Sequence, residues 1–384
     1  MHLKFGSYPV LVASSSEIAK EFLKSHDQVF ASRPLTAAGK YINYNYSDMG
    51  FAPYGPHWHQ GRRVFMNELF SAKRMESFEY IRVEEMRASV SRLYELSGKP
   101  VVLVEQLTRL TLGIISRMVL GNNCFDVSGA DRAVSNSTVS VEELQEIIKE
   151  FFILNGVFNI GDWIPWLDFL DLQGYDLIGG GTDTSAITME WAISELIKRP
   201  QLLTQATKEL DRVIGRGRWV EEKDIPQLLY IDAIIKETMR KHPVAPLLAP
   251  HLAMEDCKVA GYDIPKGTRV FVKTWSIGRD PSLWKQAEEF LPERFLGRNI
   301  DVKGTNFELL PFGAGRRMCP GYNLGLKMIQ LNLANLLHGF NWKLPDDTKA
   351  EDLSMEETYG MTTPRKFPLV AIMEPRLPLH LYKI

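Results

Sequence analysis

The sequence has few cysteines and no long apolar run, and both absences narrow the classes of protein that it can belong to. Only 3 of its 384 residues are Cys, and they lie far apart without a Cys-x-x-Cys pair. This argues against a disulfide scaffold or a zinc ribbon and favours a reducing compartment. No run of about 18 or more apolar residues is present, so no segment reads as a transmembrane helix.

The sequence also lacks an excess of charge of either sign. It has 45 Lys and Arg against 47 Asp and Glu, a formal charge of −2, whereas nucleic-acid binders usually show a marked basic excess. Neither GxGxxG nor GxxxxGK(S/T) occurs, so a phosphate-binding loop does not explain its glycines. What remains is the composition of a globular enzyme, 45% hydrophobic and 24% charged.

The spacing of apolar residues predicts a mainly α chain with a small β portion. Residues 2–12 alternate like a strand, and residues 250–275 read as short strands around a Pro-Lys-Gly turn. We treat residues 1–384 as one domain, because no linker or repeat divides them. The predicted helices begin at about Ser16 and then cover residues 53–95, 103–120, 141–155, 176–199, 201–214, 226–242 and 322–338.

The residues around Cys319 form the most informative motif. The loop 311–321 contains Gly313, Gly315 and Gly321 and leads directly into the last predicted helix. Glycines allow tight backbone conformations and close approach to a flat ligand. A helix N-terminus places N–H groups near the sulfur and favours the thiolate that binds a metal ion. Most free cysteines are small buried apolar residues instead, so the surrounding pattern has to decide between the two.

That pattern resembles the heme-binding signature of the cytochrome P450 family, FxxGxRxCxG. The resemblance implies that Cys319 is the iron ligand and that Phe312 and Arg317 lie beside the heme. It extends over nearly the whole chain and is strongest for the plant microsomal group that includes flavonoid hydroxylases. It implies the cytochrome P450 fold and heme b as the cofactor.

Two further motifs occur in the family's order. Glu237 and Arg240 share one helix face at i, i+3 spacing, and a Pro-Glu-Arg-Phe segment containing Arg294 follows. In isolation such residues are ordinary surface charges. The resemblance implies that the three form a buried network beneath the heme, with a structural role.

A Trp-x-x-x-Arg pair and a histidine are the expected partners of the heme propionates. Trp58 and Arg62 are spaced to share a helix face, and alone they would read as a core tryptophan and a surface arginine. The resemblance implies that they contact a propionate and that Arg317 and His251 add further cationic or donor groups. Two buried carboxylates require several such donors.

Glycines within the predicted helix 176–199 need a reason, since each costs about 1 kcal/mol relative to alanine. A groove for a small ligand is one reason, and a helix N-terminus within the segment is another. The stretch 180–185 resembles the family's oxygen-activation motif. The resemblance implies that Gly180 and Gly181 form the groove and that Asp183 and Thr184 deliver protons to dioxygen.

The resemblance implies a heme-thiolate monooxygenase that inserts one atom of dioxygen into a small apolar or phenolic substrate. Electrons would come from an NADPH-dependent flavoprotein reductase, at the cytosolic face of the endoplasmic reticulum membrane. Residues near Leu247 and Leu248 would set selectivity. Basic side chains form a candidate face for an acidic reductase, although any single one is equally an ordinary solvated charge. They are Arg62, Arg63, Lys73, Arg74, Lys236, Lys241 and Lys327.

Two departures from the family pattern leave an alternative open. The family's membrane anchor and proline-rich hinge do not precede residue 1, and this chain has no anchor of its own. A long segment is missing between Tyr175 and Asp176, which removes part of the lid and of the oxygen-binding helix. We expect a truncated or alternatively spliced product of a full-length monooxygenase gene, or an artefact of the gene model. The alternative to an enzyme is a catalytically inactive heme-binding remnant, while a lyase or isomerase is disfavoured because both chemical motifs look intact.

Overall fold

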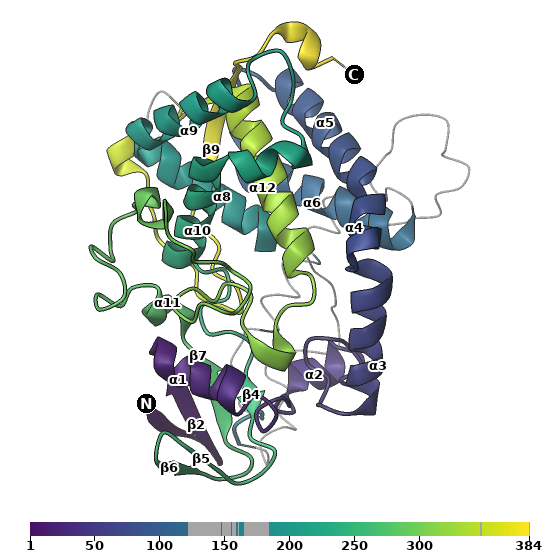
Figure 1. Ribbon diagram of the computed structural model, residues 1–384, viewed down its shortest axis with the longest axis vertical. Coiled ribbons are helices and arrows are strands. Elements are labelled where there is room, and N and C mark those ends of the chain that lie inside the picture. The colour runs from purple at the N-terminus through teal and green to yellow at the C-terminus, as the bar shows by residue number, and fades with distance from the viewer. Residues whose placement is uncertain are drawn as a thin grey trace.

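The structure is a computed structural model, and it is mostly helical with three small sheets (Figure 1). The predicted fold class is therefore confirmed. Most of the predicted helix 141–155 and the whole junction between Tyr175 and Asp176 lie outside the residues that the structure describes. The described residues are 1–121, 147, 155, 159, 161–164, 184–345 and 348–383.

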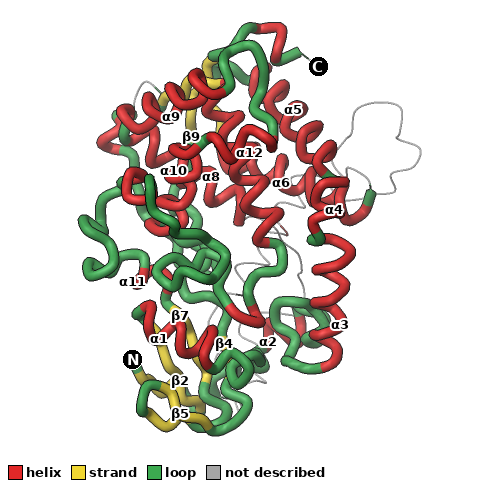
Figure 2. The backbone as a smooth tube through the Cα atoms, viewed as in Figure 1, coloured by secondary structure: helices red, strands yellow, loops and turns green. Residues whose placement is uncertain are grey.

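Most of the strands lie at the end of the molecule that holds the N-terminus (Figure 2). The largest sheet has the order β1-β2-β7-β4, with β2 and β7 parallel and the other pairs antiparallel. A second sheet has the order β3-β9-β8, and β5 pairs with β6. The strands are β1 (His2–Phe5), β2 (Tyr8–Ala13), β3 (Pro100–Val102), β4 (His251–Leu252), β5 (Cys257–Val259), β6 (Tyr262–Ile264), β7 (Arg269–Val272), β8 (Phe340–Lys343) and β9 (Val370–Pro375).

The helical part is built around α8, whose residues 186–197 are all buried. Helices α6, α10 and α12 pack directly against α8, and one large apolar core connects them. The ends of α6, α9, α10 and α12 lie within three residues of the predicted ends. These helices are α6 (Leu103–Leu120), α8 (Thr184–Lys198), α9 (Pro200–Val213), α10 (Leu229–Lys241) and α12 (Tyr322–Gly339).

The helix predicted over residues 53–95 is divided into four pieces. The chain leaves the helix at Ser71 and again at Phe78, whose φ and ψ are −97° and 5°. Neither residue is a strong helix breaker, so the apolar periodicity did not reveal these breaks. The pieces are α3 (Pro56–Val64), the π-helical turn η2 (Phe65–Leu69), α4 (Ala72–Ser77) and α5 (Glu79–Glu95).

Short elements connect the sheets to the helices, and one of them, η7, lies within the loop 311–321. The first helix begins at Ser16 as predicted, and Ser15 caps it by accepting a hydrogen bond from the Ile18 N–H at 3.5 Å. Among the described residues, no helix combines the length and the apolar character needed to cross a membrane. The short elements are α1 (Ser16–Lys20), η1 (Glu21–Ser25), α2 (Ala37–Tyr41), η5 (Glu222–Gln227), α11 (Thr274–Ile277), η6 (Pro292–Phe295), η7 (Gly315–Arg317), η8 (Ala350–Asp352) and η9 (Leu379–Leu381).

Candidate active site

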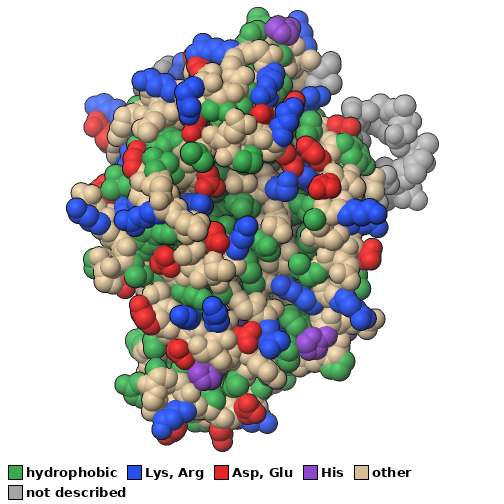
Figure 3. Space-filling view, viewed as in Figure 1, with side chains coloured by type: hydrophobic (Ala, Val, Ile, Leu, Met, Phe, Trp, Pro, Cys, Tyr) green, Lys and Arg blue, Asp and Glu red, His purple; other side chains and the backbone are tan. Residues whose placement is uncertain are grey.

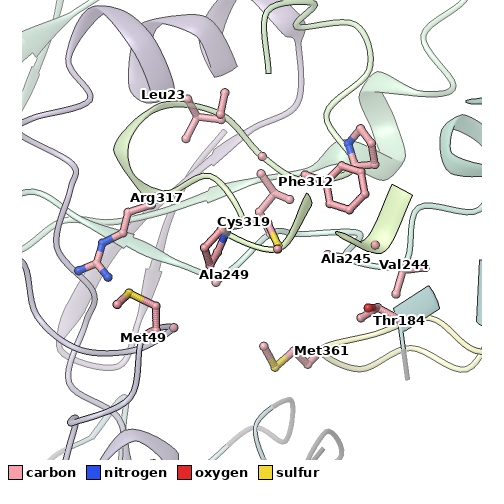
Figure 4. Close-up of a pocket in the computed structure, with 18 of the residues that line it drawn as sticks. Leu23, Met49, Thr184, Val244, Ala245, Ala249, Phe312, Arg317, Cys319 and Met361 are labelled. Atoms are coloured by element: carbon pink, nitrogen blue, oxygen red, sulfur yellow. The ribbon is translucent and has the colours of Figure 1, made fainter. Parts of the chain in front are cut away.

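A cavity of about 400 Å3 brings together stretches that are far apart in the sequence (Figure 4). Of the site residues predicted from the sequence, Gly180, Gly181 and Asp183 lie outside the described residues. All the others line this cavity. They are Trp58, Arg62, Thr184, His251, Phe312, Arg317 and Cys319.

The loop before α12 presents the Cys319 sulfur to the cavity. The Cys319 N–H donates to the carbonyl of Phe312 at 3.0 Å and closes the loop on itself. Gly315 has φ of 67°, in the left-handed region, and a Cβ there would strike the carbonyl of Leu23. Gly313 also lies in the left-handed region, with φ of 70°. Glycine is thus needed at both positions to bend the backbone around the sulfur.

The electrostatic surroundings of Cys319 correct one expectation from the sequence. Burial raises the pKa of the Cys319 thiol, although the Gly321 N–H and the charge of Arg62 act to lower it. The N–H groups at the start of α12 therefore contribute as expected, but burial outweighs them. The thiol keeps its proton until a metal ion displaces it. Gly321 itself has φ of −87°, which any residue adopts, so its backbone does not require glycine.

Three arginines line the same cavity and are held by backbone carbonyl groups. They are Arg33, Arg62 and Arg317, and only Arg33 was not predicted from the sequence. Carbonyl oxygens fix the position of a guanidinium but do not neutralise its charge. The accepting carbonyls are those of Gly50, Ala249 and Pro250 for Arg33, Met318 for Arg62, and Ala31 and Ala52 for Arg317.

This end of the cavity carries surplus positive charge. Burial, with Arg317 nearby, lowers the pKa of Arg33 to about 9, and burial lowers the pKa of Arg317 to about 10. Asp48 opposes both shifts. Its Oδ1 accepts the N–H groups of Gly50 and Phe51 at 2.6 and 2.8 Å. Asp48 acts on Arg33 and Arg317, and Arg62 adds a third guanidinium to the same cavity, so an anionic ligand would be stabilised here.

His251 is neutral in this state, which corrects its expected cationic role. Its Nδ1 lies 2.8 Å from the carbonyl oxygen of Phe30. A carbonyl oxygen only accepts, so Nδ1 carries the hydrogen. Burial, followed by the charge of Arg33, lowers the pKa of His251 to about 3. The ring therefore offers Nε2 as an acceptor, and the cations of the site are the arginines.

Two buried donors at the cavity lack a protein partner. Trp58 Nε1 and Arg317 Nη1 are buried without an acceptor among the described residues, and both residues line the cavity. A buried donor left without an acceptor costs about 1–3 kcal/mol. The free donors and the surplus positive charge fit a ligand that carries two carboxylates, and Cys319 adds a thiolate for its metal. Iron protoporphyrin has these properties, so the residues present fit heme.

The cavity wall facing Cys319 is apolar except for hydroxyl groups at the start of α8. Figure 4 shows Thr184 and Met361 on the side of the cavity away from Arg317. Val244, Ala245 and Leu248 also line it. Leu247, the other residue expected to influence selectivity, is 41% exposed and does not line the cavity.

A second group of charges lies away from the cavity, with Glu237 and Arg240 fully buried and Arg294 partly buried. Glu237 accepts two hydrogen bonds from Arg240, at 2.7 and 2.8 Å, and one from Arg294 at 3.1 Å. The Leu291 N–H also donates to Glu237, at 2.7 Å. The predicted network therefore exists in the structure, and it ties α10 to η6.

Comparison with known proteins identifies the family. The family model described as Cytochrome P450 matches residues 1–173 and, in a second stretch, residues 168–370. The chain belongs to the cytochrome P450 family. As in other cytochromes P450, its cofactor is heme b and its activity is that of a monooxygenase.

Named plant cytochromes P450 are similar over the whole chain. Trimethyltridecatetraene synthase of Zea mays is 43% identical, and the alignment covers all of this chain and 83% of the relative. Flavonoid 3'-monooxygenase of Petunia hybrida is 39% identical, with 100% and 86% coverage. A solved zebra fish cytochrome P450 with abiraterone has a TM-score of 0.78 and 26% identity, over 98% of this chain and 95% of that chain.

The comparisons also support the missing internal segment. The alignment with the maize relative spans 467 positions, whereas this chain has 384 residues, a difference of 83. The two family matches meet at residues 168–173, a few residues before the junction predicted between Tyr175 and Asp176. The relatives therefore contain a segment inside the aligned region that this cytochrome P450 lacks.

Sequence reasoning missed two charged residues, Arg33 in the heme cavity and Asp48 beside it. Arg33 lies in the stretch Phe30–Leu35, where it is the one charged side chain among apolar and small residues. That isolation was the available signal. Asp48 gave no signal, because only the folded chain brings it to Arg33 and Arg317.

Proposed function

We propose that this cytochrome P450 oxidises a small, apolar, methyl-branched hydrocarbon chain. The observation that carries the proposal is the single cavity in which Cys319 and the three arginines meet an apolar wall. Two relatives, at 43% and 41% identity, are named for methyl-branched polyenes. The flavonoid hydroxylases are similar at 39% or less, which makes a phenolic substrate the second choice.

Each residue expected to contact heme has a proposed role. Cys319 binds the iron, and Trp58, Arg33, Arg62 and Arg317 hold the two propionates. Phe312 packs beside the porphyrin, and His251 accepts a hydrogen bond through Nε2. Bound heme supplies the activation of dioxygen, of which one atom enters the substrate and the other leaves as water.

Proton supply is assigned to the start of α8. The Thr184 hydroxyl lies at the cavity and can hold a proton, while its carbonyl accepts the Thr188 hydroxyl at 2.9 Å and fixes the first turn. Asp183 stays a proposed proton donor on the strength of the sequence motif, and Gly180 and Gly181 stay proposed groove residues. All three lie outside the described residues.

The proposed partner is an NADPH-dependent flavoprotein reductase at the cytosolic face of the endoplasmic reticulum. Figure 3 shows Lys and Arg interspersed with Asp and Glu on the face in view, so steering by net charge is weak there. Arg62 lines the heme cavity instead of the surface. Four of the other basic residues proposed for docking pair with a carboxylate. They are Arg74, Lys236, Lys241 and Lys327, paired with Glu68, Asp232, Glu288 and Glu222.

A reconstituted assay tests the proposal. The full chain, loaded with heme, is combined with a plant NADPH-dependent reductase and offered a methyl-branched polyene or a flavonoid. We expect NADPH-dependent oxidation of the polyene, and faster oxidation of the flavonoid would favour the phenolic choice. Normal heme loading without any oxidised product would support the second candidate, an inactive heme-binding remnant, which the missing segment favours.

A further inference from the structure

A buried histidine outside the heme cavity is clamped between two carboxylates. His242 follows the end of α10 and is 4% exposed. Its Nε2 lies 2.6 Å from Glu195 of α8, and its Nδ1 lies 3.2 Å from Glu357. Burial acts to raise the pKa of each carboxyl, but the hydrogen bond and charge of His242, together with Arg199 beside Glu195 and Arg279 beside Glu357, outweigh it, so both pKa values lie below the ordinary value. Both carboxyls are therefore ionised acceptors.

The His242 ring is also held by stacking. It stacks on the indole of Trp191 with centroids 4.0 Å apart and an interplanar angle of 3°. The clamp is thus specific in geometry, because a side chain that replaces the ring loses the stacking and at least one of the two contacts with a carboxylate.

The clamp holds the base of a loop that reaches the heme cavity. Glu357 and Arg365 form an isolated antiparallel β-bridge through their backbones, and the Thr358 N–H donates to the Pro364 carbonyl at 3.0 Å. Residues 357–365 therefore fold back on themselves. Met361 lies at the tip of this loop and lines the heme cavity. The base therefore fixes where the Met361 side chain lies.

Thr363 fastens the same loop to the residues that follow His242. Its N–H donates to the Val244 carbonyl at 3.0 Å, and its hydroxyl donates to the Pro243 carbonyl at 2.6 Å. The Trp191 indole N–H donates to the Thr363 carbonyl at 3.0 Å. Because Val244 lines the cavity as well, one clamp sets two neighbouring parts of the apolar wall.

We propose that His242 is a positioning residue that fixes the Met361 loop and thereby sets the shape of the substrate cavity beside the heme. The inference rests on the proposed function, because it needs heme in the cavity and an organic molecule next to it. Neither His242 nor its two carboxylate partners line the heme cavity; they line a second cavity of about 490 Å3. Substitutions in the clamp therefore leave the heme-contacting residues unchanged.

Two probes of different size separate positioning from general damage. Imidazole binds heme iron and is too small to fill the cavity, whereas 4-phenylimidazole also presses a ring against the apolar wall. In the heme-loaded full chain, His242→Gln should weaken the binding of 4-phenylimidazole about three- to tenfold, which is the effect of losing part of one buried apolar contact. The affinity for imidazole should stay unchanged. Both affinities are measured from the shift of the Soret band.

A double-mutant cycle assigns the effect to the loop. Met361→Ala should weaken the binding of 4-phenylimidazole by a similar factor. Adding His242→Gln to Met361→Ala should have little further effect on this affinity. Glu357→Gln should behave like His242→Gln and carries the test if the latter does not fold. The matched control is His338→Gln, since His338 is equally buried, bonds the Arg218 carbonyl and lies outside both cavities.

Three results would overturn the inference. They are equal weakening of both probes by the clamp variants, fully additive effects with Met361→Ala, and an effect of the same size from His338→Gln. Failure of the proposed function looks different. If the unmodified chain binds no heme, neither probe shifts a Soret band, and the inference falls together with the function on which it rests. If the chain binds heme but does not turn over, both probes still shift the band, and the comparison of the variants tests the inference by itself.

Discussion

Two buried arginine clusters in this cytochrome P450 are built in opposite ways. Around Glu237, a carboxylate accepts from Arg240 and Arg294, and charges of opposite sign meet. At the heme cavity, Arg33 and Arg317 donate to carbonyl oxygens, and burial depresses their pKa values. The first cluster is complete within the protein, whereas the second carries charge and donors that find no acceptor among the described residues and that an anionic ligand would satisfy.

The comparison separates residues that hold the fold from residues that wait for the cofactor. A paired buried charge stabilises the fold, and removing one partner leaves the other uncompensated. An unpaired buried charge destabilises the heme-free protein, and its contribution appears when an anion binds. Substitutions in the two clusters should therefore affect stability in opposite directions.

The largest effect is expected for Glu237→Ala. Removing the carboxylate strands the guanidiniums of Arg240 and Arg294, at a cost of about 3–5 kcal/mol, a large part of the usual 5–15 kcal/mol. Soluble yield and the urea midpoint of the heme-free protein measure it. Glu237→Gln, which keeps an acceptor, should lose less. An unchanged urea midpoint for the alanine variant would show that the network is not structural.

The second effect concerns Arg317→Ala, which should weaken heme binding without lowering the stability of the heme-free protein. Losing a charged donor to a carboxylate costs about 1.5–3 kcal/mol, or about 10- to 100-fold in heme affinity. Heme transfer to apomyoglobin measures this loss, and urea unfolding without heme should show equal or greater stability. Arg33→Ala is the companion variant. Loss of heme-free stability in both would mean that the two clusters are built alike.

The third effect is a pH dependence that originates at His251. Its folded pKa of about 3 lies below the ordinary value, so between about pH 3 and 6.5 the unfolded chain binds more protons. The contribution of His251 to the free energy of unfolding of the heme-free protein is complete above about pH 6.5 and is lost as the pH falls toward 3. Urea titrations at several pH values should show this slope, and His251→Gln should reduce it. An unchanged slope in the variant would place the titration elsewhere.

The smallest effect on heme binding is expected for Thr184→Val. The side chain keeps its size and loses the hydroxyl that lies at the cavity. Heme content should stay the same, while the fraction of consumed NADPH that ends in oxidised product should fall. NADPH and product are counted in the reconstituted system. Unchanged coupling would remove Thr184 from the proposed proton path.

The motif around Cys319 led to the residues that the structure brings to one cavity, because its features are local. A cysteine, a helix start and glycines with positive φ occupy one short loop, so their proximity is visible in sequence spacing. The same holds for Glu237 and Arg240, which are three residues apart on one helix. Helices α6, α9, α10 and α12 were predicted for a similar reason, since one apolar face repeats along each of them, whereas the breaks within residues 53–95 leave no such signal.

The charge balance of the cavity was not predictable, because it depends on contacts across the chain. Arg33 reaches the Ala249 carbonyl, 216 residues away in the sequence. The neutral state of His251 follows from its burial beside Arg33, and burial reverses the expected pKa shift of Cys319. The clamp on His242 likewise joins Glu195 and Glu357. None of these pairs has a spacing that a motif would reveal.

The central claim is that this chain, despite the segment that its relatives contain and it lacks, holds heme through the Cys319 thiolate. The most direct measurement is the difference spectrum of the heme-loaded, reduced full chain with carbon monoxide, recorded beside Cys319→Ala. We predict a strongly red-shifted Soret band that the variant lacks, while the variant still binds heme through its arginines. A band without the red shift in the unmodified chain, or no heme at all, would contradict the account.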